Sequence, residues 1–573
     1  MNPRDEPASV CEQFRRSADR WPQSDFLQVL PEVAQHYGIA PCTLTYAQAM
    51  AVIDRLAAAY RDQGLAHGQR VGLLLENRPA FFLNWLALNG LGVSVVPISA
   101  ELRAAELEYL VGHSEISMAV VLPARVDALL AAARAARRVL RVVPCADEEP
   151  DWGLSVVSQG EDAGARIDRG AADDALPARD GGAAAPAVIT PDTECALLYT
   201  SGTTGRPKGC VLANEYFLEA GRWYAGIGGL CALQPGQDRL ISPLPMTHMN
   251  AMAYSTMAMI RVGGCVVPLD RFHPRSWWSQ VAQSRATIVH YLGVMPAMLI
   301  GAEPSPDDRR HAVRFGFGAG VDRRHHAAFE ARFGFPLLEA WAMTETGAGA
   351  VVIANREPRE VGTACFGRAE PAVQWRLVDE AGHDVPVGTP GELLVRAAGA
   401  SPRFGFFREY LKDREATDEA WRGGWFHTGD LVRADAQGSL YFIDRRKNVI
   451  RRSGENISAV EVESVLRRHP QVADVAVAAT PDPVRGDEVL ACVIARAPVP
   501  PAEQAALAES IVALALEQLA YYKAPGYVAF VDALPLTATQ KVQRGELKAL
   551  AQSLPGQSGC IDTRALKRRQ ADH

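Results

Sequence analysis

Short apolar runs alternate with amphipathic helical segments along much of this chain, and that alternation limits the fold more than any other feature. Residues 45–64 have helical periodicity and end at Gly64, a residue type that commonly terminates helices. Apolar runs at 70–77 and 92–99 follow, with a second helical segment between them. Strands that alternate with helices form parallel sheets covered on both faces. We therefore predict an α/β fold, and further strands of this type are expected at 286–292, 312–320 and 336–342.

The last third of the chain has a different pattern. Strand-like segments joined by Gly/Pro turns occur at 373–380, 391–397 and 439–444. A charged, turn-like stretch begins at Asp444 and leads into a helix start, where Ser458 can cap the helix and Glu461 can complete a capping box. Two more strands are expected at 472–480 and 488–496. These elements predict a small α+β domain from about residue 446 to the end.

Composition excludes several classes of protein. The 573 residues carry 59 Lys and Arg against 66 Asp and Glu, a net charge of −7, which gives no reason to expect nucleic acid or an anionic membrane as a partner. Ten cysteines occur singly, so we expect neither a zinc ribbon nor a disulfide framework. The start MNPRDEPASV lacks the apolar run of a secretory signal, and no apolar run reaches the ~18 residues of a membrane span. We therefore predict a cytoplasmic protein.

Two polar segments are predicted to lie at the surface. Between Glu161 and Pro191 the sequence consists mainly of Ala, Gly, Asp, Arg and Pro without periodicity, which is typical of a linker or loop. The basic run Lys567, Arg568 and Arg569 is expected to be a solvated end rather than a binding arm.

The sharpest local signal is the string LLYTSGTTGRPKGCVLAN at residues 197–214. Its apolar start is typical of a strand, and the glycines that follow let backbone amides approach an anion because no Cβ obstructs them. Hydroxyl groups add donors, and a lysine adds a point charge suited to phosphate. The residues predicted to bind a polyphosphate are Thr200, Ser201, Gly202, Thr203, Thr204, Gly205 and Lys208.

Common nucleotide motifs do not account for this string. The Walker A order G-x-x-x-x-G-K-[ST] is absent from the sequence, and GFGAGV (316–321) fails the dinucleotide pattern at its last position. A lone Gly/Thr/Ser run is most often a flexible turn. The complete string, however, resembles the phosphate loop of the adenylate-forming enzymes, which comprise acyl-CoA synthetases, luciferases and peptide-synthetase adenylation domains.

Further segments resemble the same family in the same order. AWAMTETGAG (340–349) is similar to its Thr-Glu motif, which implies that Thr344 touches the α-phosphate and Glu345 holds Mg²⁺. A carboxylate beside a polyphosphate does require a cation between them. The family usually has Tyr-Gly where this chain has Trp-Ala, and the resemblance assigns Trp341 to stacking on adenine. FGFGAG (315–320) is similar to the adenine-lining loop, with Gly318 and Ala319 letting the base lie against backbone.

Two segments resemble the family's ribose site and its crossover between domains. GWFHTGDLV (424–432) implies that Asp430 accepts hydrogen bonds from both ribose hydroxyls. The crossover sequence DRRKNVIRRSGEN (444–456) implies that Arg445 contacts ribose and phosphate and that Lys447 lies at the hinge. Ser453 and Gly454 stand in the loop that, in the family, moves against the acyl site for the second half-reaction.

The last two resemblances concern catalysis. The segment 521–547 is similar to the family's C-terminal motif, which implies that Lys541 bridges the carboxylate and the α-phosphate. Two anions must meet in this reaction, so a cation in the transition state lowers their repulsion. The family usually has Gly before that lysine, and this chain has Gln540. PLPMTHMNA (243–251) implies that His248 borders the acyl pocket.

The resemblance implies a fold and a reaction. The fold is α/β, with a large multi-layer N-terminal domain over 1–443 that contains βαβ-type subdomains and a small β-barrel-like subdomain, a hinge at 444–448, and a smaller mobile α+β domain over 449–573. The reaction is ATP-dependent acid–thiol ligation, in which a carboxylic acid becomes acyl-AMP with release of pyrophosphate and then acyl-CoA. ATP, Mg²⁺ and coenzyme A are the implied cofactors, with a small-molecule carboxylic acid as substrate. A homodimer is compatible with the sequence. Within the family the chain is most similar to crotonobetaine/carnitine-CoA and fatty-acid-CoA ligases.

The sequence leaves open which carboxylic acid is activated and which nucleophile accepts the acyl group. Candidate walls of the acyl pocket are mostly apolar and rich in Met, which suits an aliphatic or aromatic acid. A carrier protein or another nucleophile could replace CoA, and a nucleotide-binding regulator without catalysis is an alternative from another class. The wall segments are Met246–Tyr254, His290–Pro296, Phe315–Phe317 and Ala348–Val351.

Overall fold

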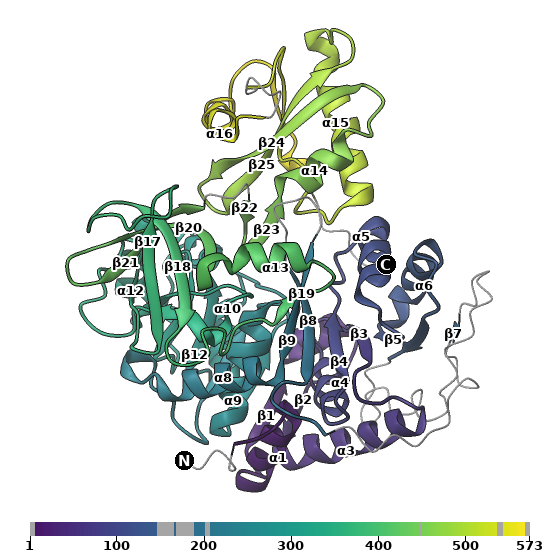
Figure 1. Ribbon diagram of the computed structural model, residues 1–573, viewed down its shortest axis with the longest axis vertical. Helices are drawn as coiled ribbons and strands as arrows, with labels where there is room; N and C mark the ends of the chain where they lie inside the picture. Colours follow the sequence, from purple (N-terminus) through teal and green to yellow (C-terminus); the bar gives the residue numbers. More distant parts are fainter. Residues whose placement is uncertain are drawn as a thin grey trace.

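The computed structural model describes residues 6–145, 166–167, 188–200, 207–445, 449–535 and 542–567. These residues form a large body, built on three sheets, and a smaller part built on a fourth sheet (Figure 1). Strand β21 (Ser439–Arg445) belongs to the third sheet, and the next strand, β22 (Val449–Arg452), belongs to the fourth. The change of sheet therefore falls at the segment for which the sequence predicts a hinge. The predicted linker between Glu161 and Pro191 lies largely outside the described residues.

The first sheet has its strands in the order β15-β14-β13-β12-β10-β11-β1-β2. Its central pairs are parallel, and the pairs at its two ends are antiparallel. The carboxyl ends of three neighbouring strands, β12 to β14, meet at one edge, which is where open α/β sheets bind ligands. The strands are β1 (Asp25–Val29), β2 (Cys42–Thr45), β10 (Arg239–Ser242), β11 (Cys265–Pro268), β12 (Ile288–Leu292), β13 (Phe315–Ala319), β14 (Leu337–Trp341) and β15 (Val352–Ile353).

The second sheet, in the order β19-β9-β8-β4-β3-β5-β6-β7, carries the strands of the predicted phosphate loop. Strands β8 and β9 pair antiparallel with Thr200 opposite Lys208. A hairpin therefore holds both ends of that loop. The strands are β3 (Arg70–Leu74), β4 (Ser94–Pro97), β5 (Met118–Val121), β6 (Arg141–Pro144), β7 (Arg166–Ile167), β8 (Glu194–Thr200), β9 (Lys208–Ala213) and β19 (Glu409–Tyr410).

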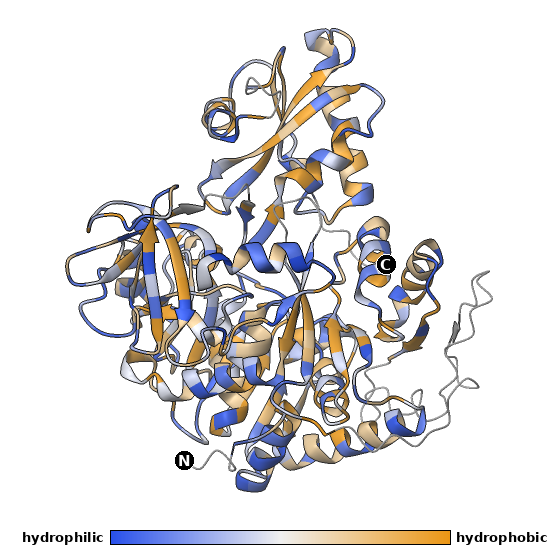
Figure 2. Ribbon diagram, viewed as in Figure 1, coloured by the Kyte–Doolittle hydropathy of each residue, from blue (hydrophilic) through white to orange (hydrophobic). Residues whose placement is uncertain are grey.

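Helices pack around these two sheets, whose central strands are hydrophobic along most of their length (Figure 2). Helix α3 begins after Thr45, which forms a capping box with Gln48, and ends just before the predicted stop at Gly64. All residues of α4 are buried. Within the described ranges no helix has the length and apolar character that a membrane crossing needs. The helices of the body are α1 (Val10–Arg20), α2 (Pro31–Tyr37), α3 (Tyr46–Asp62), α4 (Pro79–Asn89), α5 (Ala104–Ser114), α6 (Val126–Ala135), α8 (Asn214–Gly226), α9 (Thr256–Val262), α10 (Trp277–Ser284), α11 (Val294–Ile300), α12 (Arg323–Phe333) and α13 (Arg414–Ala420).

The third sheet is antiparallel throughout, in the order β16-β21-β20-β18-β17, and corresponds to the predicted small β subdomain (Figure 1). In it Asp430 lies opposite Arg445. Its remaining strands are β16 (Cys365–Arg368), β17 (Val373–Val378), β18 (Gly391–Ala397) and β20 (Phe426–Ala434).

The fourth sheet has the order β23-β22-β25-β26-β27, with β24 paired to β25. It packs on α14 and α15 around a hydrophobic core of its own. The elements are β23 (Glu455–Ser458), α14 (Ala459–Leu466), β24 (Val472–Asp482), β25 (Gly486–Ala495), α15 (Pro501–Gln518), β26 (Tyr527–Phe530), α16 (Arg544–Ser553) and β27 (Cys560–Asp562).

Only half of the predicted capping box is present at α14. The Ser458 side chain accepts a hydrogen bond from the backbone N–H of Glu461, as expected for an N-cap. The carboxylate of Glu461 does not complete the box, because it instead accepts a hydrogen bond from Lys523 Nζ at 2.8 Å. An ion pair with Lys523 has replaced the local hydrogen bond from the backbone N–H of Ser458 to the Glu461 carboxylate.

The expectation of a solvated basic tail is wrong for Lys567. Its side chain is buried, and its ammonium donates to the Glu488 carboxylate. Burial, together with the nearby Arg452, lowers the pKa of Lys567 to about 7. Sequence could not indicate this contact, because the two partners lie in elements far apart along the chain. Arg568 and Arg569 lie outside the described residues.

Candidate active site

A cavity of about 290 Å³ lies between the ligand-binding edge of the first sheet and the hairpin β22–β23 of the small part. Segments far apart in the sequence, from all four sheets, meet in its wall. Convergent polar groups in an apolar cleft are typical of a substrate site. The predicted site residues in this wall are Thr200, Lys208, His248, Ala319, Trp341, Thr344, Glu345, Asp430 and Gly454.

Lys208, which the sequence predicts to bind phosphate, lines the cavity at the start of β9. Its Nζ lies 3.6 Å from Oδ2 of Asp413 and 4.8 Å from the ring centroid of Tyr410. A carboxylate and an aromatic face together hold the ammonium at the cavity wall. The predicted loop residues Ser201, Gly202, Thr203, Thr204 and Gly205 lie outside the described residues.

The Thr-Glu segment is fixed by contacts to its neighbours. The carbonyl of Thr344 accepts from the Tyr216 hydroxyl at 2.9 Å, and the backbone N–H of Phe407 donates to the carbonyl of Glu345 at 2.9 Å. The Tyr410 hydroxyl donates to Oε1 of the buried Glu345 carboxylate at 2.8 Å. Burial and this carboxylate raise the pKa of Tyr410 far above its ordinary value, so the hydroxyl stays a donor.

The residues present fit a Mg²⁺ ion that arrives with a nucleotide. Mg²⁺ in such sites is bound by one or two carboxylates together with substrate phosphates. Glu345 supplies one carboxylate at the cavity wall, with Oε1 bonded to Tyr410. Across the part of the chain that the structure describes, no three His, Cys, Asp or Glu side chains cluster into a self-contained metal site.

An unexpected hydrogen bond joins two cavity residues that the resemblance assigns to the nucleoside. The indole Nε1–H of Trp341 donates to Oδ2 of Asp430 at 2.9 Å, and both side chains are buried. Trp341 also stacks on Phe366, with ring centroids 6.1 Å apart. The resemblance assigns Trp341 to adenine, and the structure adds a contact that the sequence did not predict, a hydrogen bond that orients the predicted ribose carboxylate. Arg445 pairs with Asp430 through the backbone of β21.

The predicted adenine loop divides into two roles. Ala319 lines the cavity, together with Gly320. Gly318 packs instead against the neighbouring strand, because a Cβ there would lie 2.3 Å from the carbonyl oxygen of Tyr291. Gly318 therefore permits close strand packing beside the cavity.

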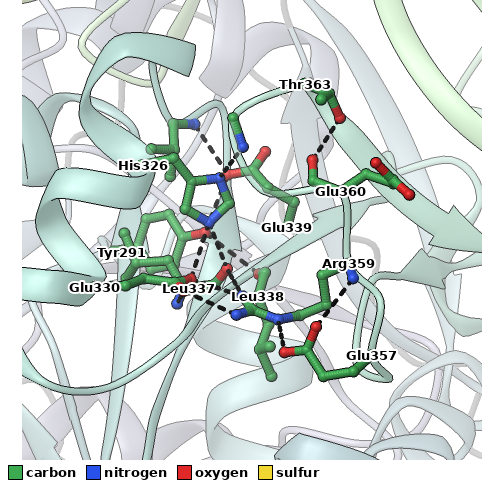
Figure 3. Close-up of polar contacts among 12 residues, drawn as sticks. Tyr291, His326, Glu330, Leu337, Leu338, Glu339, Glu357, Arg359, Glu360 and Thr363 are labelled. Atoms are coloured by element: carbon green, nitrogen blue, oxygen red, sulfur yellow. Dashed lines mark hydrogen bonds and ion pairs between the residues drawn. The ribbon is translucent and has the colours of Figure 1, made fainter.

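Glu339, which sequence reasoning missed, fixes the backbone after β13. Its carboxylate accepts from the backbone N–H groups of Gly320 and Val321, each at 3.0 Å, and from the Tyr291 hydroxyl at 3.1 Å (Figure 3). Burial raises the pKa of Glu339 although these donors favour its charged form. Because Glu339 itself lines the cavity, it connects the loop's shape to the site.

A second carboxylate, that of Glu330, helps to hold α12 against β14 next to Glu339. Glu330 on α12 is bound by Arg359, at 2.6 and 2.8 Å, and lies 3.1 Å from Nε2 of His326 (Figure 3). Burial alone would raise the pKa of Glu330, but Arg359 outweighs it and holds that pKa at about 2. The network ties α12 to β14, since the same His326 nitrogen lies 3.0 Å from the carbonyl of Leu337.

His248, which the resemblance assigns to the acyl pocket, lines the cavity. Its Nε2 lies 3.3 Å from Oε1 of Glu455, which belongs to the small part of the chain. Burial alone would lower the pKa of His248, but the Glu455 carboxylate outweighs it and raises that pKa above its ordinary value. Conversely, burial would raise the pKa of Glu455, and His248 holds it below its usual range.

The hairpin loop at Ser453 and Gly454 sits directly against the body. Gly454 has φ +89°, and a Cβ there would come within 2.1 Å of Cδ1 of Leu292 at the end of β12. Ser453 has φ +51°, and its N–H donates to the carbonyl of Arg485 at 2.9 Å. Only glycine therefore allows the hairpin to approach this closely.

A second, larger cavity of about 930 Å³ adjoins the first and runs between α5 and the small part. Five residues line both cavities, so the two cavities share part of their wall. They are Thr200, Pro245, His248, Thr344 and Asn456.

Two groups of residues need separate mention. The first group was predicted from the sequence but lies outside the described residues, and the second lines or supports the site but had only a weak signal in the sequence. Lys447 and Lys541 are in the first group. Glu455 belongs to the SGEN string, so its segment was found but its contact with His248 was not. Tyr410 and Asp413 lie in EYLKD, a segment with no distinctive composition.

Comparisons with known proteins agree with this geometry. The profile of AMP-binding enzymes matches residues 14–410, and that of the AMP-binding enzyme C-terminal domain matches residues 461–541. A crotonobetaine/carnitine–CoA ligase from Escherichia coli (strain SE11) is 30% identical over 513 residues, which cover 87% of this chain and 91% of that protein.

Solved structures share the fold. A double mutant of the o-succinylbenzoate CoA synthetase from Bacillus subtilis, bound to a product analogue, superposes with a TM-score of 0.75 at 22% identity, and the match covers 94% of this chain and 98% of that chain. The same enzyme bound to AMP gives a TM-score of 0.60. The amide bond synthetase of Marinactinospora thermotolerans gives 0.75 at 23% identity, with 94% and 100% covered. Given the extent of the profile and sequence matches, this chain belongs to the family of AMP-binding enzymes.

Proposed function

We propose that this protein is an ATP-dependent acid–thiol ligase, which activates a carboxylic acid as acyl-AMP and then forms acyl-CoA. The observation that carries the proposal is one cavity wall shared by Lys208, Glu345, Asp430 and His248. Lys208 suits phosphate and Glu345 suits Mg²⁺. Asp430 suits the ribose hydroxyls, and His248 suits the acid. The names of the CoA ligase and CoA synthetase relatives support CoA as the acceptor.

In the first half-reaction a carboxylate oxygen of the acid attacks the α-phosphorus of ATP. A new O–P bond forms while the bond to pyrophosphate breaks. Such transfers need positioning and charge neutralisation more than covalent work by the protein. We assign Lys208 and the loop 200–205 to the phosphates, Glu345 to Mg²⁺, Thr344 to the α-phosphate and Lys541 to the bridge between the two anions.

The nucleoside is held from the other side. We assign Asp430 to the ribose hydroxyls, with Trp341 orienting it, and Arg445 to ribose and phosphate. We assign Ala319, which lines the cavity, to the adenine side, whereas Gly318 permits the close strand packing beside it. These roles follow the resemblance and are supported by the convergence of the described members on the cavity.

In the second half-reaction the CoA thiolate attacks the acyl carbonyl carbon, so that a C–S bond forms and AMP leaves. The larger cavity supplies a route to His248 and Thr344. We infer that the described arrangement is the thioester-forming one, with domains 1–443 and 449–573 reorienting about Lys447. The contact of His248 with Glu455, the close packing at Gly454 and the higher TM-score to the product-analogue complex support this.

Half-reaction assays test these roles. Lys541→Ala should abolish ATP–pyrophosphate exchange and still let CoA react with a supplied acyl-adenylate. Lys447→Pro should spare adenylation and impair thioester formation. Exchange that survives in the first variant, or equal loss of both steps in the second, would contradict the assignment.

A second candidate function keeps the adenylation step and changes the acceptor. The amide bond synthetase matches this chain as well as the CoA synthetase does, which favours testing amines and a holo carrier protein beside CoA. A cytoplasmic location is part of the proposal. It is supported by the ten cysteines, all of which lie in the described residues as free thiols.

A further inference from the structure

A buried histidine that the proposed reaction does not use lies behind the acyl wall of the smaller cavity. Nδ1 of His290, on β12, lies 2.7 Å from Oδ1 of Asn250 and 2.8 Å from Oγ of Ser255. Its Nε2 lies 3.0 Å from the Tyr224 hydroxyl. Burial lowers the pKa of His290 to about 3, so the imidazole is neutral at physiological pH.

These contacts define which atom donates. An amide oxygen only accepts, so Nδ1 of His290 carries the proton and donates to Asn250, while Nε2 accepts from Tyr224. Asn250 is thereby held through its oxygen, and its Nδ2 keeps two N–H donors. Asn250 lines the smaller cavity, as do Met249 and Leu292.

The backbone around Asn250 is unusual in a way that serves this contact. Residues Asn250–Ser255 form a π-helical turn, an element that is rare and frequent at functional sites. Its wider turn brings Asn250 and Ser255, five residues apart, to the same nitrogen of His290.

The space behind this wall is filled. Phe317 stacks on His290 with ring centroids 4.7 Å apart and on Tyr224 at 4.9 Å, and all three side chains are buried. The sequence predicts an apolar acyl pocket with His290 and Phe317 in its wall. In the structure both lie behind the wall, and Asn250 presents an amide to the cavity.

We propose that Asn250 selects the acid by donating a hydrogen bond from Nδ2 to an oxygen on its acyl part, so that the preferred substrates are short acids carrying a ketone, hydroxyl or amide oxygen. The inference rests on the proposed function of this cavity. A hydrocarbon acid would cover the amide without satisfying it, which is unfavourable in a water-excluded site. His290 is the positioning residue, because it fixes the amide through Oδ1.

Matched acids provide the test. Pyrophosphate release is measured with straight-chain acids of one length that carry a ketone at successive positions, and with the parent acid. For at least one ketone position we expect kcat/KM to exceed that of the parent by about ten-fold, the value of one hydrogen bond. In Asn250→Leu that ratio should fall to about one, with the parent acid retained as a substrate. Met249→Leu, which alters an apolar neighbour in the wall, should change kcat/KM for the ketone acid and for the parent acid by the same factor.

The role of His290 has its own readout. His290→Gln should reduce the ketone-to-parent ratio by raising KM for the ketone acid more than it changes kcat. If Asn250→Leu does not fold, the inference is tested by comparing the ketone-to-parent ratio of kcat/KM in His290→Gln with the same ratio in the unmodified enzyme. A ratio of about one in the unmodified enzyme, or a higher kcat/KM for acids with a quaternary ammonium group, overturns the inference and leaves the proposed function intact. No acid-dependent pyrophosphate release from any acid overturns both.

Discussion

Nζ of Lys523 lies 2.5 Å from Oε1 of Glu106, and this ion pair joins the small C-terminal part to helix α5 of the large body. The backbone N–H of Ala520 donates to the other oxygen of Glu106 at 3.0 Å, and Glu461 binds the same ammonium. Burial alone would lower the pKa of Lys523, but the two carboxylates raise it far above its ordinary value. The contact is specific to the described domain arrangement, because its partners come from both parts.

Glu106→Gln should therefore slow the thioester step selectively. The variant removes one charge from a buried pair, a change that is strongly unfavourable where the pair exists. We expect single-turnover transfer from acyl-AMP to CoA to slow about ten-fold, with ATP–pyrophosphate exchange unchanged. Glu509→Gln, at an exposed position on α15, is the matched control. Equal slowing of both half-reactions would show that the pair does not discriminate between arrangements.

Gly454→Ala should have the same selectivity for a steric reason. The added Cβ would come within 2.1 Å of Leu292, and φ at this position is +89°. The contact with Leu292 and the backbone strain both oppose docking of the hairpin, so thioester formation should fall about ten-fold while acyl-AMP still forms. Gly545→Ala, where no heavy atom lies within 4 Å, controls for glycine replacement in the same part of the chain. A variant with normal CoA transfer would refute the docked hairpin.

The pair of His248 and Glu455 should titrate in a defined direction. Because the pKa of His248 is raised, the protonated imidazole stabilises the contact with Glu455 at low pH, and this stabilisation is lost as pH rises through that pKa. The lowered pKa of Glu455 means that its contribution is lost as pH falls through its own value. The contact is therefore strongest between the two pKa values.

NMR titration of ¹³C-labelled histidine, with the His248 signal assigned by His248→Gln, measures this. In Glu455→Gln the carboxylate charge is lost, so the pKa of His248 should fall from its raised value. A pKa of His248 that is the same in both proteins would mean that the two side chains do not meet in solution.

Trp341→Phe should weaken ATP binding through the ribose. The ring remains aromatic, but the hydrogen bond to Asp430 is lost. Because a hydrogen bond to a charged group contributes about 1.5–3 kcal/mol, we expect KM for ATP to rise about ten-fold with kcat little changed. With 2′,3′-dideoxy-ATP the difference between the variant and the unmodified enzyme should largely disappear. An equal rise with both nucleotides would assign the effect to adenine stacking.

The sequence predicts the layered fold and most of the polar wall because both depend on local information. Alternating strand and helix patterns determine the sheets, and the phosphate loop, the Thr-Glu segment and Asp430 occur in strings with recognisable composition. The hairpin that places Thr200 opposite Lys208 follows from two apolar strands around a glycine-rich loop.

The contacts across the two parts of the chain could not be predicted in this way. Glu106 and Lys523 are ordinary charged residues in sequence, and their pairing depends on how two domains pack. The hydrogen bond from Trp341 to Asp430 likewise needs the third sheet to meet β14, and the buried His290 needs the π-helical turn. The capping box at Glu461 was predicted wrongly for the same reason, since a tertiary partner outweighs a local one.

Acid-dependent release of pyrophosphate is the most direct test of the central claim. The purified protein is incubated with MgATP and a broad panel of carboxylic acids, with and without CoA, and pyrophosphate, AMP and thioester are measured. We predict a limited release of pyrophosphate with some acid alone, and repeated turnover with acyl-CoA and AMP as products once CoA is added. Binding of ATP without pyrophosphate release across the whole panel would contradict the account and indicate a nucleotide-binding regulator.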